Sequence, residues 1–561
     1  MSIDDRVEVA AGEASLEATP AGTWTPAAPA ARAWAVVRAA LARPGGDAWG
    51  AILVAAAFIG LTCWWLTQDR SIPVYDAGDH LQDALLFHDM LASGNLLGPL
   101  SFVSIYPPLA VTVGAIAALV GGVGVAPPIV GENLVFVPLL ALGCYRTGRL
   151  LFDSRAGLLA VVFALGSPLL IAQLHVFMLD APETAMVAVS IWLLLECDRF
   201  SRPGMCAWAG LAVGAGTLVK VQYPPFVIGI VLMALLRGGW RNWRGLGIFA
   251  AVAAVIVAPW YLDHLAELSE FVHVAGPHAG VPAGDTPPTF SLANFAWYFW
   301  NILNSQFLAP LFALIVGGTI WMALTLWRTR GGARHAPRLD FFVGAVVAWL
   351  LVTAPPSHDV RYAMPLIPYL AVIATGWIVY LPRPARLLAT ALVVLGVLAN
   401  TAGTTFGLGG VVQLELAHPL PAGEEAADSI VVYSNQALLV AGPRRDGDVP
   451  GLLVALRRDG VGTVSWGETQ SAAPDFSAEG LIPLAHIAGL RGVTTRTPEF
   501  ARSAAIATLL HGPVGAHSPP ACTRLSDGTG VWVVRYDPAA GRLALYCPDR
   551  SPAYYDPGAV S

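Results

Sequence analysis

The sequence predicts a polytopic α-helical membrane protein of about 11 spans, followed by a C-terminal α/β domain. The first observation behind this prediction is composition. Of 561 residues, 55% are hydrophobic and only 12% are charged, whereas about 25% of the residues in a soluble domain are charged. The second observation is a series of long runs without Asp, Glu, Lys or Arg, at residues 50–67, 156–174, 245–262, 306–327, 341–357, 362–382 and 387–413. Each run approaches the roughly 20 apolar residues that cross about 30 Å of hydrocarbon, a length that a soluble core does not require.

The N-terminal segment, residues 1–48, differs from the rest of the chain. It is rich in Ala and Pro, and Arg32, Arg38 and Arg43 lie near its end. It lacks the pattern of a cleaved signal peptide, so we expect a partly disordered cytoplasmic tail.

The distribution of arginine predicts the topology, because short cytoplasmic loops carry an excess of basic residues. Five short segments are rich in arginine, at residues 144–155, 198–204, 237–244, 328–338 and 383–386. The segments that alternate with them contain only Arg70, Lys220 and Arg361 as basic residues. We therefore expect a multi-pass protein of the inner or plasma membrane, with its N-terminus in the cytoplasm and its C-terminus outside.

Residues 107–123 are apolar enough to span the membrane, but a span here would place the arginines of 144–155 outside. We interpret the segment as a re-entrant or interfacial helix within a first outer loop at 69–127, with an ordinary span as the alternative. The spans are then expected near residues 49–68, 128–145, 156–174, 182–197, 205–219, 222–237, 245–262, 304–327, 340–356, 362–381 and 386–406. Residues 49–406 thus form the predicted membrane domain.

Residues 407–561 form the predicted extracytoplasmic α/β domain, because charges, Gly and Pro return there and the apolar runs shorten. The elements expected in it are strands at 429–433 and 462–466, a helix at 450–458, and a hairpin of 530–536 with 542–547. Cys522 and Cys547 are the only cysteines of this domain and flank the hairpin. A disulfide between them is expected in an oxidising compartment.

Two classes of binding site are not indicated. The net charge is −6 and no basic stripe with interleaved aromatic residues is present, so nucleic-acid binding is not expected. The Cys and His residues do not have the spacing of metal ligands.

Ionisable residues are functional by default in so apolar a chain, and four groups of them lie on the predicted outer side. In the first, Asp76, Asp79 and Asp83 are spaced to share one helix face, next to His80. Repulsion between carboxylates makes one of them a stronger base, and a base near an acceptor hydroxyl is what inverting sugar transfer requires. An acidic turn that caps a helix is the alternative.

The second group contains His175, Asp180 and Glu183; its two carboxylates either act in a site or cap the helix that follows. The third is Lys220, the only lysine of the chain. Its ammonium can meet a phosphate as a point charge, and snorkelling to the interface is the alternative.

The fourth group contains His358, Asp359 and Arg361. The Arg361 guanidinium can bind a phosphate through two donors. An Arg361–Asp359 ion pair that merely closes the loop is the alternative.

In this order, these segments resemble the motifs of the family-39-like GT-C membrane glycosyltransferases, the branch that contains protein O-mannosyltransferases and the aminoarabinose transferases of lipid A. Asp79-His80 stands where that family has Asp-Glu, and Tyr106 begins a Tyr-Pro-Pro-Leu where it has His-Pro-Pro-Leu. Further matches are Leu-Asp-Ala-Pro at 179–182, Gly-Thr-Leu-Val-Lys at 216–220 and Arg-Tyr-Ala-Met-Pro-Leu-Ile-Pro at 361–368. The resemblance covers residues 50–405.

The resemblance implies a GT-C-like fold and an inverting transferase that takes a sugar from a polyprenyl-phosphate-linked donor. The acceptor is a protein, lipid or polysaccharide at the outer membrane face. Asp79 is implied as the general base, Asp180 as its support or as a residue that orients the acceptor, and Asp76 as a substitute for the missing Glu. Lys220 and Arg361 would bind the donor phosphate. The cavity residues are expected to be His80, Tyr106, His175, Glu183 and His358.

No cofactor is required by this resemblance, and a divalent metal is not indicated, although other GT-C enzymes use one. A flippase or transporter of lipid-linked sugars is the alternative function. Such a protein needs internal repeats or paired broken helices near the midplane, and the sequence shows no repeat. A scaffold whose outer domain binds a partner is the third hypothesis.

Overall fold

The computed structural model describes residues 46–73, 75–274, 290–329, 336–355, 358–420, 427–435, 442–443, 453, 457, 463–467, 478–490, 493–494, 507–513, 523–524, 529–537, 542–546 and 553–554. The chain divides into two compact units, Met1–Arg43 and Pro44–Ser561, and the described residues all belong to the second. Most of the predicted tail at 1–48 and both cysteines of the predicted disulfide, Cys522 and Cys547, lie outside the described residues.

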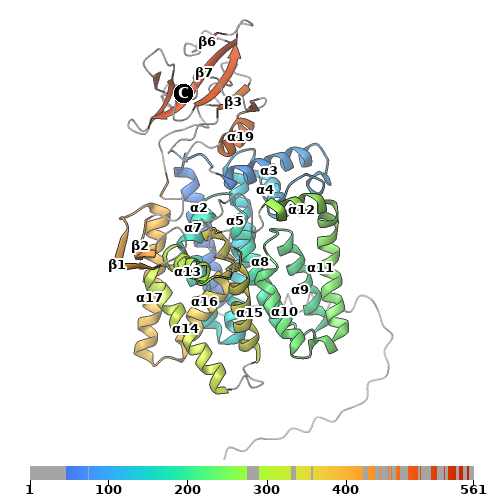
Figure 1. Ribbon diagram of the computed structural model, residues 1–561, viewed down its shortest axis with the longest axis vertical. Helices are drawn as coiled ribbons and strands as arrows, with labels where there is room; N and C mark the ends of the chain where they lie inside the picture. The colour runs from blue at the N-terminus through green and yellow to red at the C-terminus, as the bar shows by residue number, and fades with distance from the viewer. Residues whose placement is uncertain are drawn as a thin grey trace, which may run out of the picture. The chain divides into compact units, whose positions relative to one another are not determined.

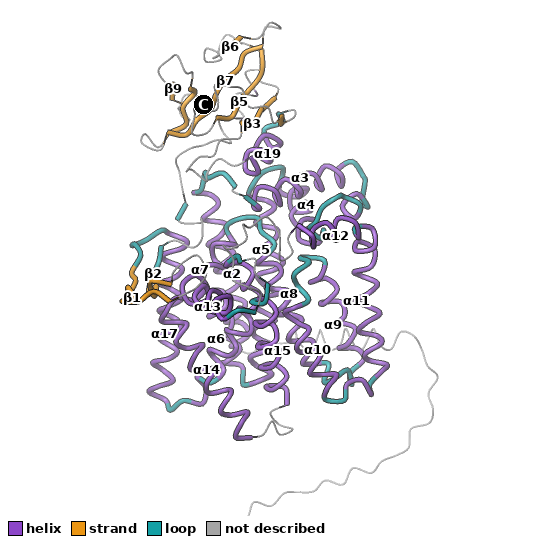
Figure 2. Tube along the Cα trace, viewed as in Figure 1, coloured by secondary structure: helices purple, strands orange, loops and turns teal. Residues whose placement is uncertain are grey.

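Helices make up the described chain from residue 46 to residue 406, and strands occur only after it (Figures 1 and 2). The α-helices are α2 (Gly46–Gln68), α3 (Asp76–Ala92), α4 (Leu109–Gly121), α5 (Ala126–Leu151), α6 (Ser154–Leu165), α7 (Pro168–Leu174), α8 (Asp180–Glu196), α9 (Pro203–Thr217), α10 (Pro225–Leu236), α11 (Trp243–Asp263), α12 (Leu265–Val274), α13 (Leu292–Asn301), α14 (Leu308–Thr329), α15 (Ala336–Val352), α16 (Ile367–Gly376) and α17 (Arg383–Phe406). Shorter helical turns are η1 (Gly98–Leu100), η2 (Gly239–Arg241), η3 (Ile302–Phe307), η5 (Val360–Leu366) and η6 (Ile378–Tyr380).

The structure is that of a multi-pass helical membrane protein. Among the described residues, six helical stretches are long and apolar enough to cross a bilayer: Gly46–Gln68, Ala126–Leu151, Trp243–Asp263, Leu292–Thr329, Val360–Tyr380 and Arg383–Phe406. The pair α6 and α7 makes a seventh if it is one span. The predicted count of about 11 is not confirmed, because α8, α9, α10 and α15 have only 17, 15, 12 and 17 residues, fewer than the roughly 20 of a straight span.

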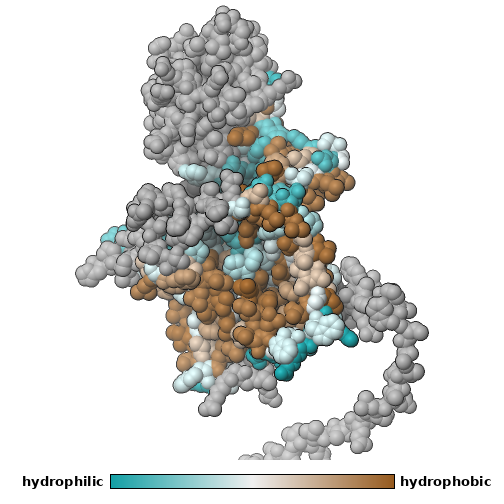
Figure 3. Space-filling view, turned by 45° about the vertical axis from the view of Figure 1, so that its right-hand side comes forward, coloured by the Kyte–Doolittle hydropathy of each residue, from teal (hydrophilic) through white to brown (hydrophobic). Residues whose placement is uncertain are grey.

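Large apolar side chains cover the outside of the helical region (Figure 3). Leu236 of α10, Val255 of α11, Trp327 of α14 and Leu388 of α17 are all more than 70% exposed. A soluble protein rarely exposes so many large apolar residues together. This surface is therefore suited to lipid rather than to water.

Helix α4 has 13 residues, which is too short for a span. It follows Pro107 and Pro108 and ends before Gly122, whose φ of 91° is accessible to glycine. Its length agrees with the interpretation of residues 107–123 as a re-entrant or interfacial helix, and its place relative to the membrane stays a prediction.

The predicted span at 156–174 is broken. Ser167 accepts a hydrogen bond from the Leu170 amide and starts α7 at Pro168, so that α6 and α7 meet at 68°. Because proline cannot donate to the preceding turn, the break falls where the sequence places Ser-Pro. The chain then turns into α8, which is buried along most of its length against α5, α9 and α10. The core of the helical region therefore surrounds α8 and the acidic residues at its start.

The C-terminal segment contains two sheets. Strands β1 (Val412–Leu420) and β2 (Ala427–Tyr433) form an antiparallel hairpin. The larger sheet has the order β4-β3-β5-β7-β8-β9, with β6 beside β7. Its strands are β3 (Thr463–Gly467), β4 (Val493–Thr494), β5 (Ala507–Pro513), β6 (Thr523–Arg524), β7 (Thr529–Asp537), β8 (Arg542–Tyr546) and β9 (Ala553–Tyr554). The predicted hairpin is present as β7 and β8, and most of the predicted helix at 450–458 lies outside the described residues. The extracytoplasmic location of this segment stays a prediction.

One helix of the C-terminal segment, α19 (Ala478–Ile487), packs on α3. Nε2 of His486 lies 3.0 Å from Oδ2 of Asp89, and Nδ1 of His486 lies 3.3 Å from Nε2 of Gln82. Leu484 is buried, and a Cβ atom at Gly480 would lie 2.0 Å from the Pro73 carbonyl oxygen. The close approach of α19 to the loop that precedes α3 therefore requires glycine at position 480.

Candidate functional site

The residues at the start of helix α3 differ in their exposure to solvent. It starts at Asp76, directly after Tyr75, whose φ of 48° is uncommon for a residue other than glycine. Asp76 is half-buried, Asp79 is exposed, and His80 is only 2% exposed. The helical spacing thus separates Asp79 from His80, which faces the interior.

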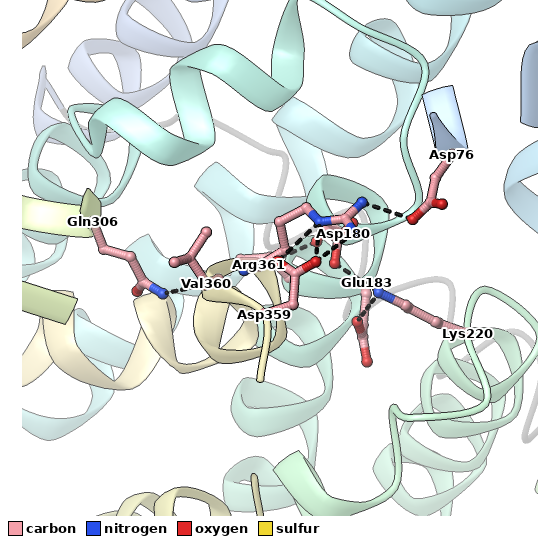
Figure 4. A network of polar contacts seen from close by, with 9 residues as sticks. Asp76, Asp180, Glu183, Lys220, Gln306, Asp359, Val360 and Arg361 are labelled. Atoms are coloured by element: carbon pink, nitrogen blue, oxygen red, sulfur yellow. Dashed lines mark hydrogen bonds and ion pairs between the residues drawn. The ribbon is translucent and has the colours of Figure 1, made fainter. Parts of the chain in front are cut away.

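The Arg361 guanidinium lies between Asp359 and Asp76 (Figure 4). Its Nε donates to both oxygens of Asp359 at 3.0 and 2.9 Å, and its Nη2 donates to Oδ2 of Asp359 at 2.5 Å. Its Nη1 donates to Oδ2 of Asp76 at 2.8 Å. The alternative weighed from the sequence, an Arg361–Asp359 ion pair, is therefore present, and Asp76 joins this pair from 285 positions away.

Lys220 makes the second ion pair, with the two carboxylates at the start of α8 (Figure 4). Its Nζ donates to Oδ1 of Asp180 at 2.6 Å and lies 3.9 Å from Oε2 of Glu183. All three side chains are buried. Burial opposes the charge of the ammonium, but Asp180 and Glu183 outweigh this effect and raise the pKa of Lys220. Lys220 is therefore a buried, permanently charged cation rather than a snorkelling one.

His80 and Tyr106 lie beside these pairs and contact each other edge to face, with ring centroids 4.5 Å apart. Burial lowers the pKa of His80 to about 4, against the opposing effect of the Asp76 carboxylate. Burial, with the Asp76 carboxylate next, raises the pKa of Tyr106 to about 12. Both side chains are therefore neutral near pH 7, so they can line a cavity without adding charge.

The neutral state of His80 predicts a pH dependence of stability. Below about pH 6.5 the unfolded chain binds a proton that buried His80 does not bind, so stability falls as the pH falls toward 4. We expect acidification from about pH 7 to about pH 5 to cost the wild type about 1–2 kcal/mol more than the His80→Gln variant. Thermal unfolding in detergent at both pH values measures this difference.

Asp83 provides the internal control for that experiment. Burial, with the Asp79 carboxylate next, raises the pKa of Asp83 to about 7, so its effect has the opposite sign and stability falls as the pH rises. The His80→Gln variant keeps this contribution. Equal pH dependence in wild type and His80→Gln would show that His80 is not neutral in the fold.

Two other predicted site residues, His175 and His358, make ring contacts outside the two ion pairs. The His175 ring stacks on Trp65, with centroids 4.5 Å apart and planes within 3°. The His358 ring stacks on Trp297 at 4.5 Å and is hydrogen-bonded to Asn294. These contacts give both histidines a packing role and leave their predicted place in the cavity a proposal.

Sequence reasoning missed Glu132. It lies in α5, it is 1% exposed, and neither carboxylate oxygen has a hydrogen-bond partner among the described residues. Glu132 is close enough to Asp180 for the two carboxylates to repel each other. The signal was present, because an ionisable residue inside a predicted span is functional by default.

The cations and carboxylates form one electrostatic site. Asp180 interacts with Arg361 as well as with Lys220, so the two ion pairs are coupled. The two cations of this group can donate hydrogen bonds to a phosphate and stabilise negative charge that develops on it. In the part of the chain that the structure describes, no group of three or more His, Cys, Asp or Glu side chains is arranged to hold a metal ion.

The likenesses of this chain to solved structures are distant. It is similar to ArnT from Cupriavidus metallidurans in the apo state, with 19% identity and a TM-score of 0.42 over 67% of this chain and 65% of that one. For the same protein bound to undecaprenyl phosphate, the identity is 19% and the TM-score is 0.45, over 65% and 67% of the two chains. An oligosaccharyltransferase from Archaeoglobus fulgidus shows 12% identity and a TM-score of 0.39, over 64% and 54%. The chain thus spans about two thirds of ArnT and about half of the archaeal enzyme.

In sequence, no curated protein matches the chain. Residues 106–262 match the family model described as dolichyl-phosphate-mannose-protein mannosyltransferase. That segment begins at Tyr106 and contains Asp180, Glu183 and Lys220. The expected resemblance to GT-C membrane glycosyltransferases of the protein O-mannosyltransferase type is therefore confirmed, with the family match extending over residues 106–262.

Proposed function

We propose that this protein is an inverting glycosyltransferase that moves a sugar from a polyprenyl-phosphate-linked donor to an acceptor at the outer membrane face. One observation carries the proposal. Lys220 and Arg361, which are far apart in the sequence, lie in one acidic site that is buried around Lys220 and partly exposed around Arg361 and Asp76. A structural protein has little reason to gather a buried lysine and a partly buried arginine with four carboxylates, because buried ion pairs seldom add net stability.

In the proposed reaction, an acceptor hydroxyl oxygen attacks the anomeric carbon on the face opposite the phosphate. The bond between this carbon and the phosphate oxygen breaks, and its electron pair stays on the phosphate. The hydroxyl proton passes to the carboxylate of Asp79, which is exposed and can reach an acceptor from outside. Lys220 and Arg361 stabilise the phosphate monoester as it leaves, so no separate general acid is required.

The donor phosphate would enter the charge network beside the existing partners of the two cations. The Lys220 ammonium has three donors, of which one reaches Asp180 at 2.6 Å. Arg361 uses Nη1 for Asp76. Competition between phosphate and Asp76 for this nitrogen would free the Asp76 carboxylate when donor binds. Asp76 is then suited to orient the acceptor hydroxyl toward Asp79.

The reaction class is tested by its products. Purified protein in proteoliposomes is mixed with lipid-linked sugars extracted from its own host, and release of free polyprenyl phosphate is followed together with new glycosides by mass spectrometry. We expect the two products in equal amounts. Movement of the lipid-linked sugar across the bilayer without polyprenyl phosphate release would instead establish a flippase. Comparison of envelope glycans and glycoproteins from a deletion strain then identifies the acceptor.

A further inference from the structure

The segment that precedes Arg361 is held by the helix pair α13 and η3. At its start, the buried amide of Asn294 donates from Nδ2 to three successive carbonyl oxygens, those of Thr353, Ala354 and Pro355, at 2.6, 3.2 and 3.0 Å. Farther along, the His358 ring stacks on Trp297 of α13. These contacts fix residues 353–355 and His358 against α13.

The last contact is on the peptide bond that joins Val360 to Arg361 (Figure 4). Nε2 of Gln306, a fully buried residue of η3, donates to the Val360 carbonyl oxygen at 3.2 Å. The amide of the same peptide bond, that of Arg361, donates to Oδ1 of Asp359 at 2.8 Å. Because a peptide unit is planar, hydrogen bonds at both of its edges fix its orientation. The direction in which the Arg361 side chain leaves the backbone is therefore set from two sides.

The opposite side of η3 contacts the β1–β2 hairpin. Nδ2 of Asn304 donates to the Ser429 carbonyl oxygen at 2.9 Å, and Oδ1 of Asn304 accepts from the Val431 amide at 2.9 Å. One side-chain amide thus pairs with the edge of β2 as a neighbouring strand would. The turn that carries Asn304 and Gln306 is a π-helix, a rare geometry that is frequent at functional sites.

We propose that Gln306 is a positioning residue for Arg361 and that Asn304 couples the β1–β2 hairpin to the same segment through η3. This inference rests on the proposed function, in which Arg361 binds the donor phosphate. The guanidinium donors form a rigid fork, so a small rotation of the Val360–Arg361 peptide misdirects all of them together. Gln306 does not touch substrate and acts only through Arg361.

The test uses Gln306→Met, which keeps the length of the side chain but cannot donate, with Gln306→Leu as a second variant. Full-length protein in detergent is titrated with undecaprenyl phosphate. We expect the Kd to rise about three- to tenfold, the range that the loss of one hydrogen bond gives. Because Arg361 also stabilises the leaving phosphate, kcat should fall as well, and kcat/KM for donor should fall by at least the same factor. Asn304→Leu is expected to change affinity in the same direction by a smaller factor.

The matched control is Asn301→Leu, because the Asn301 amide donates within its own helix, to the Trp297 carbonyl oxygen at 3.0 Å, rather than to the Arg361 segment. Its affinity for undecaprenyl phosphate should equal that of the wild type. An equal loss in Asn301→Leu would show that the effect is a general one of this helix and would overturn the assignment to Gln306.

The Arg361→Met background separates the two hypotheses. If Arg361→Met binds undecaprenyl phosphate as tightly as the wild type does, the proposed role of Arg361 fails whatever Gln306 does. If Arg361→Met binds weakly and Gln306→Met weakens it no further, the two residues act as a unit and the positioning role is supported. If the two losses multiply, or if Gln306→Met alone changes nothing, the positioning role is overturned while the function of Arg361 stands.

Discussion

Replacing Asp79 with Asn is expected to reduce sugar transfer by about 10²–10⁴-fold while the protein stays folded. The Asn side chain keeps the shape of the carboxylate, but it is uncharged and cannot take up the acceptor proton. Asp79 is exposed, so its replacement removes little buried contact. The measurement is the initial rate of polyprenyl phosphate release at saturating donor, with thermal unfolding recorded on the same preparation.

Two neighbouring aspartates of α3 serve as comparisons. Asp83→Asn, one turn farther along, is the matched control and should retain near-normal turnover. Asp76→Asn should chiefly alter donor affinity, because Asp76 contacts Arg361 at 2.8 Å. A normal rate in Asp79→Asn together with a collapse of the rate in Asp76→Asn would reassign the base to Asp76.

Lys220→Met should be the most destabilising single change in the site, at about 3–5 kcal/mol. The Lys220 ammonium donates to the buried Asp180 carboxylate at 2.6 Å, so its removal leaves that carboxylate without its cation. Glu183 loses the same cation. The remaining carboxylates then repel each other without compensation. Denaturant or thermal unfolding in a fixed detergent measures the loss, and donor turnover should disappear as well.

A surface pair gives the control for this change. Arg202 and Glu196 form an exposed ion pair at 3.2 Å, and Arg202→Met should cost only about 0.2–1 kcal/mol. In the double variant Lys220→Met/Asp180→Asn, stability should return in part, because one unpaired charge is gone, while transfer should not return. Recovery of transfer in that variant would show that Lys220 does not serve the donor phosphate.

The limits of sequence reasoning are clear at particular helices. Residues 107–123 were interpreted as a re-entrant or interfacial helix, because a full span would have placed the arginines of 144–155 on the wrong side, and the 13 residues of α4 agree with this interpretation. The predicted count of about 11 spans is not confirmed, because the absence of charge does not report helix length or bending. Residues 156–174 have no charge, yet Ser167 and Pro168 divide them into two helices at 68°.

In the site, contacts between residues close in the sequence could be predicted, and contacts between distant residues could not. Arg361 and Asp359 are two positions apart, so their ion pair could be weighed from the sequence alone. The contact of Arg361 with Asp76 depends on where the fold places α3 relative to η5, which no local pattern encodes. Glu132 was overlooked because most of the predicted span at 128–145 is apolar. Its charge inside that span was the signal of a functional residue.

The packing of α19 on α3 has a consequence for biosynthesis. Gln82 and His486, which meet at this contact, are 404 positions apart. At roughly 5–20 residues per second, translation adds the second roughly 20–80 s after the first. During that interval α3, the helix that carries Asp76 and Asp79, lacks its packing partner α19. A nascent chain can therefore insert every membrane helix before α3 is fully packed. The order of synthesis thus delays the packing of α19 on α3 until residues 478–487 have left the ribosome.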